Sequence, residues 1–326
     1  MGSNEYGYIG DTPTQSSSSN NGVFGSEDVY DLIDQGKWAL QTIDVSYLVV
    51  AGGGSGGTGY NKCGGGGGAG GYRNSYASET SGANSSTETP ITLAPDGSTT
   101  YTVTVGAGGV GGYHGANGGD SVFSTITSVG GGKGGGRNSA GSSGGSGGGQ
   151  ANGTAFSGTA NQGNDGGVGN YSNYKMGAGG GASQVGADMT SGWNGVDGGD
   201  GLSSSITGSA VTRAGGGGSS RNYADPSDPA GSSRGNAGGD GGSGGGGDGA
   251  GDGNTSNNGS NATANTGGGG GGNDTGTGYN GGSGIVILRF PTTPYTVGSG
   301  LTVSASTSGG DTILQFTAGT DTITFG

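Results

Sequence analysis

The side chains that most often carry catalysis or bind metals are scarce in this sequence. Its 326 residues include one histidine, His114, and one cysteine, Cys63. A zinc site needs three or four such ligands at recognised spacings, and an activated nucleophile needs a neighbouring base. Neither arrangement is available, and a lone cysteine forms no intrachain disulfide. We therefore expect no catalytic residue, no cofactor, no metal and no enzymatic activity.

The glycine-rich stretches raise two further possibilities, phosphate binding and calcium binding. A P-loop needs Gly-Lys followed by Ser or Thr, but Gly132-Lys133 is followed by Gly134. The segment GGDGGSGGGGDGAGDGN at 238–254 has the composition of calcium-binding nonapeptide repeats without their large apolar residues. Polar loops are the favoured interpretation of this segment. Calcium binding stays an open alternative at three aspartates, Asp240, Asp248 and Asp252.

Composition excludes several classes of protein. The net charge is −13 with only 10% charged residues, and the few basic residues are scattered, whereas nucleic-acid binding needs a clustered basic surface. The start, MGSNEYGYIGDTP, lacks the basic and apolar regions of a secretory signal. The longest apolar runs, near 47–51 and 285–288, are too short to span a membrane. We expect no nucleic-acid partner and no membrane insertion.

A few segments have the pattern of regular structure. The runs VSYLVVA (45–51) and GIVILRF (284–290) are bounded by glycine or proline, and we predict that these two strands pair and enclose the glycine-rich region. Alternation predicts further strands at 101–105 and 121–126. Ser26, followed by acids and then by apolar residues at helical spacing, predicts a short helix over 26–36.

Glycine supplies 93 residues, whereas hydrophobic residues make up only 26%. That is too few for a conventional core of this length, and disorder or a flexible linker would be the ordinary interpretation. The glycine runs, however, are compact, similar in length and enclosed by matching strands. In the polyproline II conformation every backbone polar group points outward and can bond to a neighbouring rod. We therefore predict a mostly irregular and β fold, a bundle of polyglycine II helices clasped by short strands.

Aromatic residues in or beside the inter-rod loops are the candidates for recognition. Tyrosine gives a large contact area at low entropic cost, and small polar residues adapt around it. Covering the sides of the bundle is the alternative role for the same residues. The candidate recognition residues are Tyr72, Tyr76, Tyr171, Tyr174, Trp193, Tyr223 and Tyr279. The candidate docking residues of the short helix and its flank are Val29, Leu32, Ile33 and Trp38.

The chain resembles the glycine-rich domain proteins of tailed phages. The resemblance rests on five segments in the family's usual order, which together cover about 45–290. These segments are YLVVAGGGSGG (47–57), GGGGGAGGYR (64–73), YTVTVGAGGVGG (101–112), NGGDSVF (117–123) and GGSGIVILRF (281–290). The segment at 20–38 is similar to one that often precedes this domain in phage structural proteins. The ending TILQFTAGTDTITF resembles a β motif usually found upstream of it.

The resemblance implies a virion protein, made in a host cytoplasm without a signal peptide. We expect three parts: a docking segment (1–45), a glycine-rich domain (46–290) and a small β-strand appendage (291–326). The expected function is that of a tail-fibre or adhesin component that binds a host surface glycan or protein through its loops. A purely structural capsid or tail decoration protein is the alternative. Other virion proteins are the expected partners of the docking segment, and a homotrimer is possible.

Overall fold

The computed structural model describes residues 15–16, 19–20, 42–58, 63–136, 139–151, 153–170, 175–221, 237–251 and 259–326. The regular secondary structure of these residues is nearly all β, and the one helical element among them is a three-residue turn, η1 (Gly82–Asn84). The helix predicted over 26–36 lies outside the described residues. Two short hairpins stand apart from the main sheet: β1 (Gln15–Ser16) with β2 (Ser19–Asn20), and β9 (Leu202–Ser204) with β10 (Val211–Arg213).

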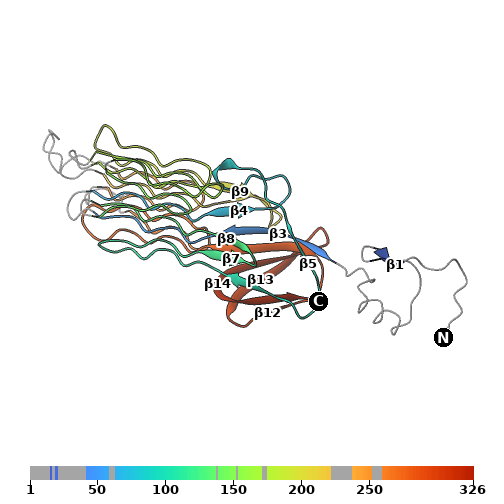
Figure 1. Cartoon of the computed structure of the whole chain (residues 1–326). Coiled ribbons are helices and arrows are strands. Elements are labelled where there is room, and N and C mark those ends of the chain that lie inside the picture. Colours follow the sequence, from blue (N-terminus) through green and yellow to red (C-terminus); the bar gives the residue numbers. More distant parts are fainter. Residues whose placement is uncertain are drawn as a thin grey trace, which may run out of the picture.

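The remaining ten strands form one antiparallel sheet, which gathers at one end of the molecule (Figure 1). Its path runs β4-β3-β11-β14-β6-β7-β8, and β5, β12 and β13 pair beside this path. The strands of the path are β4 (Tyr72–Asn74), β3 (Ile43–Val50), β11 (Ile285–Pro291), β14 (Asp311–Phe325), β6 (Thr100–Thr104), β7 (Ser121–Phe123) and β8 (Ile126–Ser128). The strands beside it are β5 (Ile91–Leu93), β12 (Tyr295–Val297) and β13 (Leu301–Ser308).

The predicted pairing of the two apolar runs is confirmed. Strands β3 and β11 are antiparallel neighbours, with Val50 opposite Ile285 and Leu48 opposite Ile287. Both faces of this pair are buried, which explains why the two runs are continuously apolar instead of alternating. One face, which includes Val49 and Leu288, enters the main hydrophobic core. The other face forms a second core with small residues of the glycine-rich segments.

The sheet curls into a nearly closed, barrel-like shape. Strand β14 is long enough to pair with β11 along its first half and with β6 along its second half. Strands β7 and β8 then return towards β3, where Ser121 Oγ donates to Val50 O at 2.9 Å and Ser128 Oγ donates to Val49 O at 2.7 Å. The curled sheet encloses a core that contains the edge-to-face ring pair Phe290 and Phe325, with ring centroids 5.0 Å apart.

The C-terminal segment differs from the expected small separate unit. The β-strands expected in this segment are present, and residues 311–325 form one continuous strand, β14. Strand β14 lies in the middle of the sheet, and its Leu314, Phe316 and Ile323 are fully buried in the main core. Residues 311–325 therefore complete the barrel-like sheet of the glycine-rich domain.

The prediction of a bundle of polyglycine II helices is wrong. The described residues form a barrel-like antiparallel sheet, and the glycine-rich segments between its strands are connections without regular secondary structure. The physical reason is the uneven distribution of apolar residues. Although they are few in the whole chain, they are concentrated in β3, β11 and β14, where they suffice for two hydrophobic cores.

The connections themselves form a second part of the molecule, here called the glycine body. It extends from the sheet as long segments that run beside one another (Figure 1). Its segments are 51–58, 63–71, 105–120, 129–136, 139–151, 153–170, 175–201, 214–221, 237–251 and 259–284. Backbone hydrogen bonds join segments far apart in sequence: Gly67 N donates to Gly270 O at 2.8 Å, and Gly217 N donates to Gly67 O at 2.8 Å. Buried backbone polar groups thus find partners without a ladder of strands.

Aspartates fix the polar edges of the glycine body. Each of six carboxylates accepts a hydrogen bond from a backbone N–H at 2.7–2.9 Å, four of them from another segment and two, Asp165 and Asp248, from an earlier residue of their own segment. The six are Asp120, Asp165, Asp188, Asp197, Asp200 and Asp248. The polar residues that interrupt the glycine runs therefore bind the segments together, in addition to forming loops.

We expect Asp200→Ala to lower the free energy of unfolding by about 1–3 kcal/mol, because Asp200 accepts two hydrogen bonds as a charged group. Its Oδ1 accepts from both the N–H and the hydroxyl of Ser243, each at 2.8 Å. Denaturant unfolding of the purified chain measures the loss. Asp200→Asn keeps an oxygen acceptor and should lose clearly less, so equal losses for the two variants would contradict this role.

Candidate binding surfaces

Two of the predicted recognition residues are structural. Tyr72 is fully buried at the start of β4 and belongs to the second core. Burial, helped by the nearby charge of Glu79, raises the pKa of Tyr72 above its ordinary value. Tyr76 packs against the same core, and the guanidinium of Arg289 lies over its ring at 5.1 Å from the centroid. Tyr72 lies in the sheet and Tyr76 lies two residues after β4, and both are held by contacts with the second core.

Two other candidates are half-buried in the glycine body. Tyr279 accepts a hydrogen bond at its carbonyl from Gly56 N at 2.9 Å, and its pKa is raised by burial and by the charge of Asp274. Trp193 lies in the turn at 191–194. The structure does not bring these two together with Tyr72 and Tyr76 into one surface. The candidates outside the described residues are Tyr171, Tyr174 and Tyr223 from the loops, and Val29, Leu32, Ile33 and Trp38 from the docking segment.

An exposed apolar loop was missed by the sequence reasoning. Val110 is 70% exposed and Tyr113 is 45% exposed, and the Tyr113 ring meets the His114 ring edge-to-face with centroids 4.8 Å apart. The sequence does carry a signal for this loop. A lone valine between glycine pairs, in AGGVGGYHG, has no apolar neighbour at strand spacing with which to share a core.

The base of this loop is fixed to the glycine body. Gly111 N donates to Asn280 Oδ1 at 2.6 Å, and Ala116 N donates to Ser55 Oγ at 2.9 Å. The Lys133 ammonium donates to the His114 carbonyl at 2.9 Å. We call residues 110–114 the apolar loop. It presents an aliphatic side chain, an aromatic pair and a nearby positive charge on a base that is hydrogen-bonded on both sides.

The remaining chemistry-bearing groups are dispersed. Cys63 is buried, and Asp248 is occupied by Gly241 N and Ser260. Within the described ranges, no three His, Cys, Asp or Glu side chains gather closely enough to hold a metal ion. Asp252, the third calcium candidate, lies outside them. The described part of the chain contains no helix with the length and apolar character needed to cross a membrane.

One buried ion pair lies within the glycine body. Arg221 Nε and Asp274 Oδ2 are 3.5 Å apart, and the two side chains are only 3% and 5% exposed. Burial raises the pKa of Asp274, and the Arg221 charge opposes that rise. Breaking a buried pair leaves an uncompensated charge, so this contact holds the 214–221 and 259–284 segments in one arrangement.

Comparison with known protein families identifies the family of this chain. The sequence pattern of the glycine-rich domain family matches residues 36–291, a range that includes both β3 and β11. The match spans most of the chain, and the protein belongs to this family. Comparisons with curated proteins and with solved structures found no match.

Proposed function

We propose that this chain is a structural attachment protein of a phage virion, a tail-fibre or adhesin component that binds a host cell-surface glycan or protein. The observation that carries the proposal is the apolar loop, 110–114. Val110 is 70% exposed and lies beside an exposed tyrosine, and exposed apolar groups on a fixed base are typical of contact surfaces.

The construction of the glycine body supports the same role. Attachment outside a cell needs a scaffold that holds short loops in fixed positions. Here the base of the apolar loop is fixed by hydrogen bonds to the side chains of Asn280 and Ser55, and backbone hydrogen bonds join the segments around it. A bound partner therefore requires little further ordering of the chain. The scarcity of catalytic side chains favours binding over chemistry.

The virion location rests on the resemblance to phage proteins, which rests on five motifs. Those motifs lie within the region that matches the glycine-rich domain family. A host-surface partner agrees with the acidic composition, which favours solubility over binding to nucleic acid.

The test is binding of fluorescently labelled full-length protein to a panel of bacterial strains, measured by flow cytometry. We expect saturable binding to at least one strain, and a loss of about tenfold or more in the Val110→Ser, Tyr113→Ser double variant, since a few central residues carry most of the energy of an interface. Val211→Ser is the matched control, because Val211 is also exposed but lies in β10.

Two results would contradict attachment through this loop. One is equal binding by the double variant and the wild type. The other is no binding to any strain by protein that is nevertheless incorporated into virions, which would favour the decoration role.

A further inference from the structure

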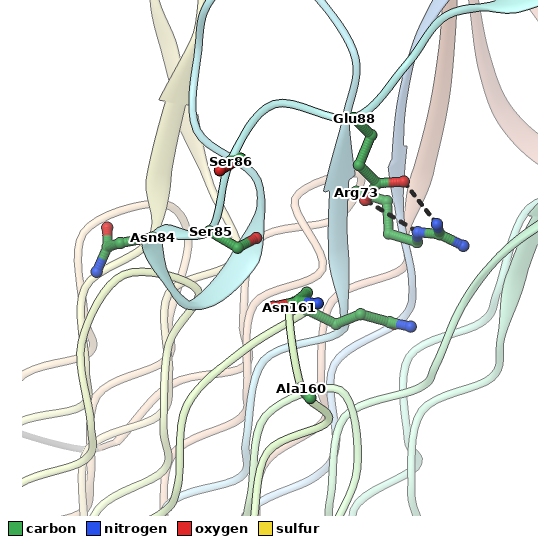
Figure 2. A pocket seen from close by; sticks show the side chains of 8 residues that line it. Arg73, Asn84, Ser85, Ser86, Glu88, Ala160 and Asn161 are labelled. Atoms are coloured by element: carbon green, nitrogen blue, oxygen red, sulfur yellow. Dashed lines mark hydrogen bonds and ion pairs between the residues drawn. The ribbon is translucent and has the colours of Figure 1, made fainter.

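A polar cavity lies where the sheet meets the glycine body, and its lining shares no residue with the apolar loop. Its volume is about 630 Å³, within the range of small-molecule sites. One wall is the segment that contains Asn84, Ser85 and Glu88, and the opposite wall is the turn at 160–162 (Figure 2). Arg73 of β4 reaches into the space between them.

Both walls are fixed before any ligand binds. Gln162 accepts hydrogen bonds from Tyr72 N at its carbonyl, at 2.9 Å, and from Val129 N at its side chain, at 2.8 Å. The opposite wall is held by Asn84 Nδ2, which donates to Ser183 O at 2.7 Å. A cavity with walls tied to both the sheet and the glycine body needs little rearrangement to receive a ligand.

The charges at the cavity cancel. The Arg73 guanidinium donates to both oxygens of Glu88, at 3.0 and 2.6 Å. The Glu88 carboxylate also accepts from Tyr47 Oη at 2.8 Å and from Ser81 Oγ at 2.9 Å. This carboxylate is saturated by four donors and its charge is matched by Arg73. The arrangement therefore favours neither a free anion nor a metal cation.

The cavity carries no net charge, but some of its polar groups can still form hydrogen bonds to a ligand. The Ser85 hydroxyl is buried and has no hydrogen-bond partner among the described residues, and such a group calls for a ligand or water. Arg73 uses three of its five N–H donors in the contacts to Glu88 and to the Thr127 carbonyl. Asn161 adds an amide on the opposite wall.

The backbone around the cavity is in an uncommon conformation. Two of the seven non-glycine residues with positive φ in the described part of the chain line the cavity, Asn84 (54°) and Asn161 (61°), and Ala83 (55°) directly precedes Asn84. Such conformations are costly for alanine in particular and cluster at ligand sites. Here they face one another across the two walls.

We propose that this cavity binds a neutral saccharide of one or two sugar residues. The neighbouring hydroxyls of a sugar accept hydrogen bonds from the guanidinium and from amide groups, and they donate hydrogen bonds to serine and amide oxygens. A neutral sugar brings no charge. This assignment is independent of the attachment proposed for the apolar loop, because the two sites share no residue.

The test is NMR titration of the ¹⁵N-labelled full chain with glucose, galactose, N-acetylglucosamine and maltose, and with glucuronate as an anionic comparison. We expect saturable shifts of signals from 84–86 and 161–162 with at least one neutral sugar, and weaker shifts with glucuronate. Maltose is also compared with a soluble polymer of the same unit. Binding of maltose alone assigns the cavity to small sugars, equal binding of both assigns it to glycan ends, and either result supports the site.

A double variant and a matched control test whether Ser85 and Asn161 bind the sugar. The Ser85→Val, Asn161→Gly double variant removes both polar groups, and glycine tolerates the positive φ at 161. We expect binding to weaken about tenfold or more. Asn265→Gly makes the same change at another residue of positive φ, 60°, outside the cavity, and should bind like the wild type. Absence of neutral-sugar shifts in the wild type, stronger glucuronate binding, or equal binding by a folded double variant would overturn the proposal.

Discussion

Gly67→Ala should lower the free energy of unfolding by about 3 kcal/mol, near the upper end of the range for overpacked cores. Gly67 is buried in the glycine body, and a methyl group there would lie closer than 3.0 Å to the carbonyl oxygens of Gly54 and Ser55. Those neighbours are backbone atoms, which cannot turn aside as a flexible side chain could. The Gly67 segment would have to move away and lose its hydrogen bonds to Gly270 and Gly217.

Gly112→Ala is the matched control for this effect. A methyl group at Gly112 would meet only Gly115 N, at 3.9 Å, and the residue needs no positive φ. We expect its unfolding free energy to stay within about 0.5 kcal/mol of the wild type, as for surface substitutions that disturb no contact. Chemical denaturation of the two variants side by side measures the difference. Equal stabilities would mean that close backbone packing does not hold the glycine body together.

Phe316→Ala should lower the free energy of unfolding by about 3–5 kcal/mol, the usual cost of removing a buried phenyl ring. Phe316 lies in β14, between β11 and β13, and is fully buried in the main core. If residues 291–326 were a separable appendage, this substitution would leave the unfolding of the glycine-rich domain unchanged. Because β14 completes the sheet, we expect one cooperative transition, shifted as a whole.

Val303→Ala is the control for Phe316. Val303 lies directly opposite Phe316 across the β13–β14 pair but is 37% exposed. Its truncation removes a smaller and partly solvated group, and we expect a loss below about 1 kcal/mol. Thermal unfolding followed by circular dichroism compares the variants. A Phe316→Ala protein with two separate transitions, one of them at the wild-type temperature, would contradict the single sheet.

The strands were the part of the fold that the sequence predicted best. The runs that became β3 and β11 are apolar, β-branched and bounded by glycine or proline, so both their existence and their pairing could be inferred. Alternation located β6 and β7. The predicted strand at 121–126 is divided, because Ser124 takes a φ of 52° and turns the chain between β7 and β8. A serine gives little warning of such a turn.

The arrangement of the sheet could not be read from local pattern. Nothing in TILQFTAGTDTITF states that it pairs with β11 at one end and with β6, about 200 residues earlier, at the other. The glycine runs were misinterpreted for a related reason. The low overall hydrophobic content suggested that no core could form. Two cores form nevertheless, because the apolar residues are concentrated in a few strands.

The candidate surfaces were predicted less well than the strands. Tyr72 and Tyr76 follow a glycine run and suggested a loop, but Tyr72 opens β4 opposite Val50 and is buried. The cavity was not predicted at all. It joins Arg73 and Glu88 to a turn at 160–162, and residues so far apart in sequence carry no common motif.

Amide hydrogen exchange of the full chain tests most directly whether the glycine body is one ordered structure bonded through its backbone. We predict that the amides of 64–71 and 214–219 exchange nearly as slowly as those of β3, because most of them donate to carbonyls of other segments within a buried interior. The turn that contains the exposed residues 113–114 serves as the fast reference. If the amides of 64–71 and 214–219 exchanged as fast as those of that turn while β3 stayed protected, the result would contradict an ordered, backbone-bonded glycine body.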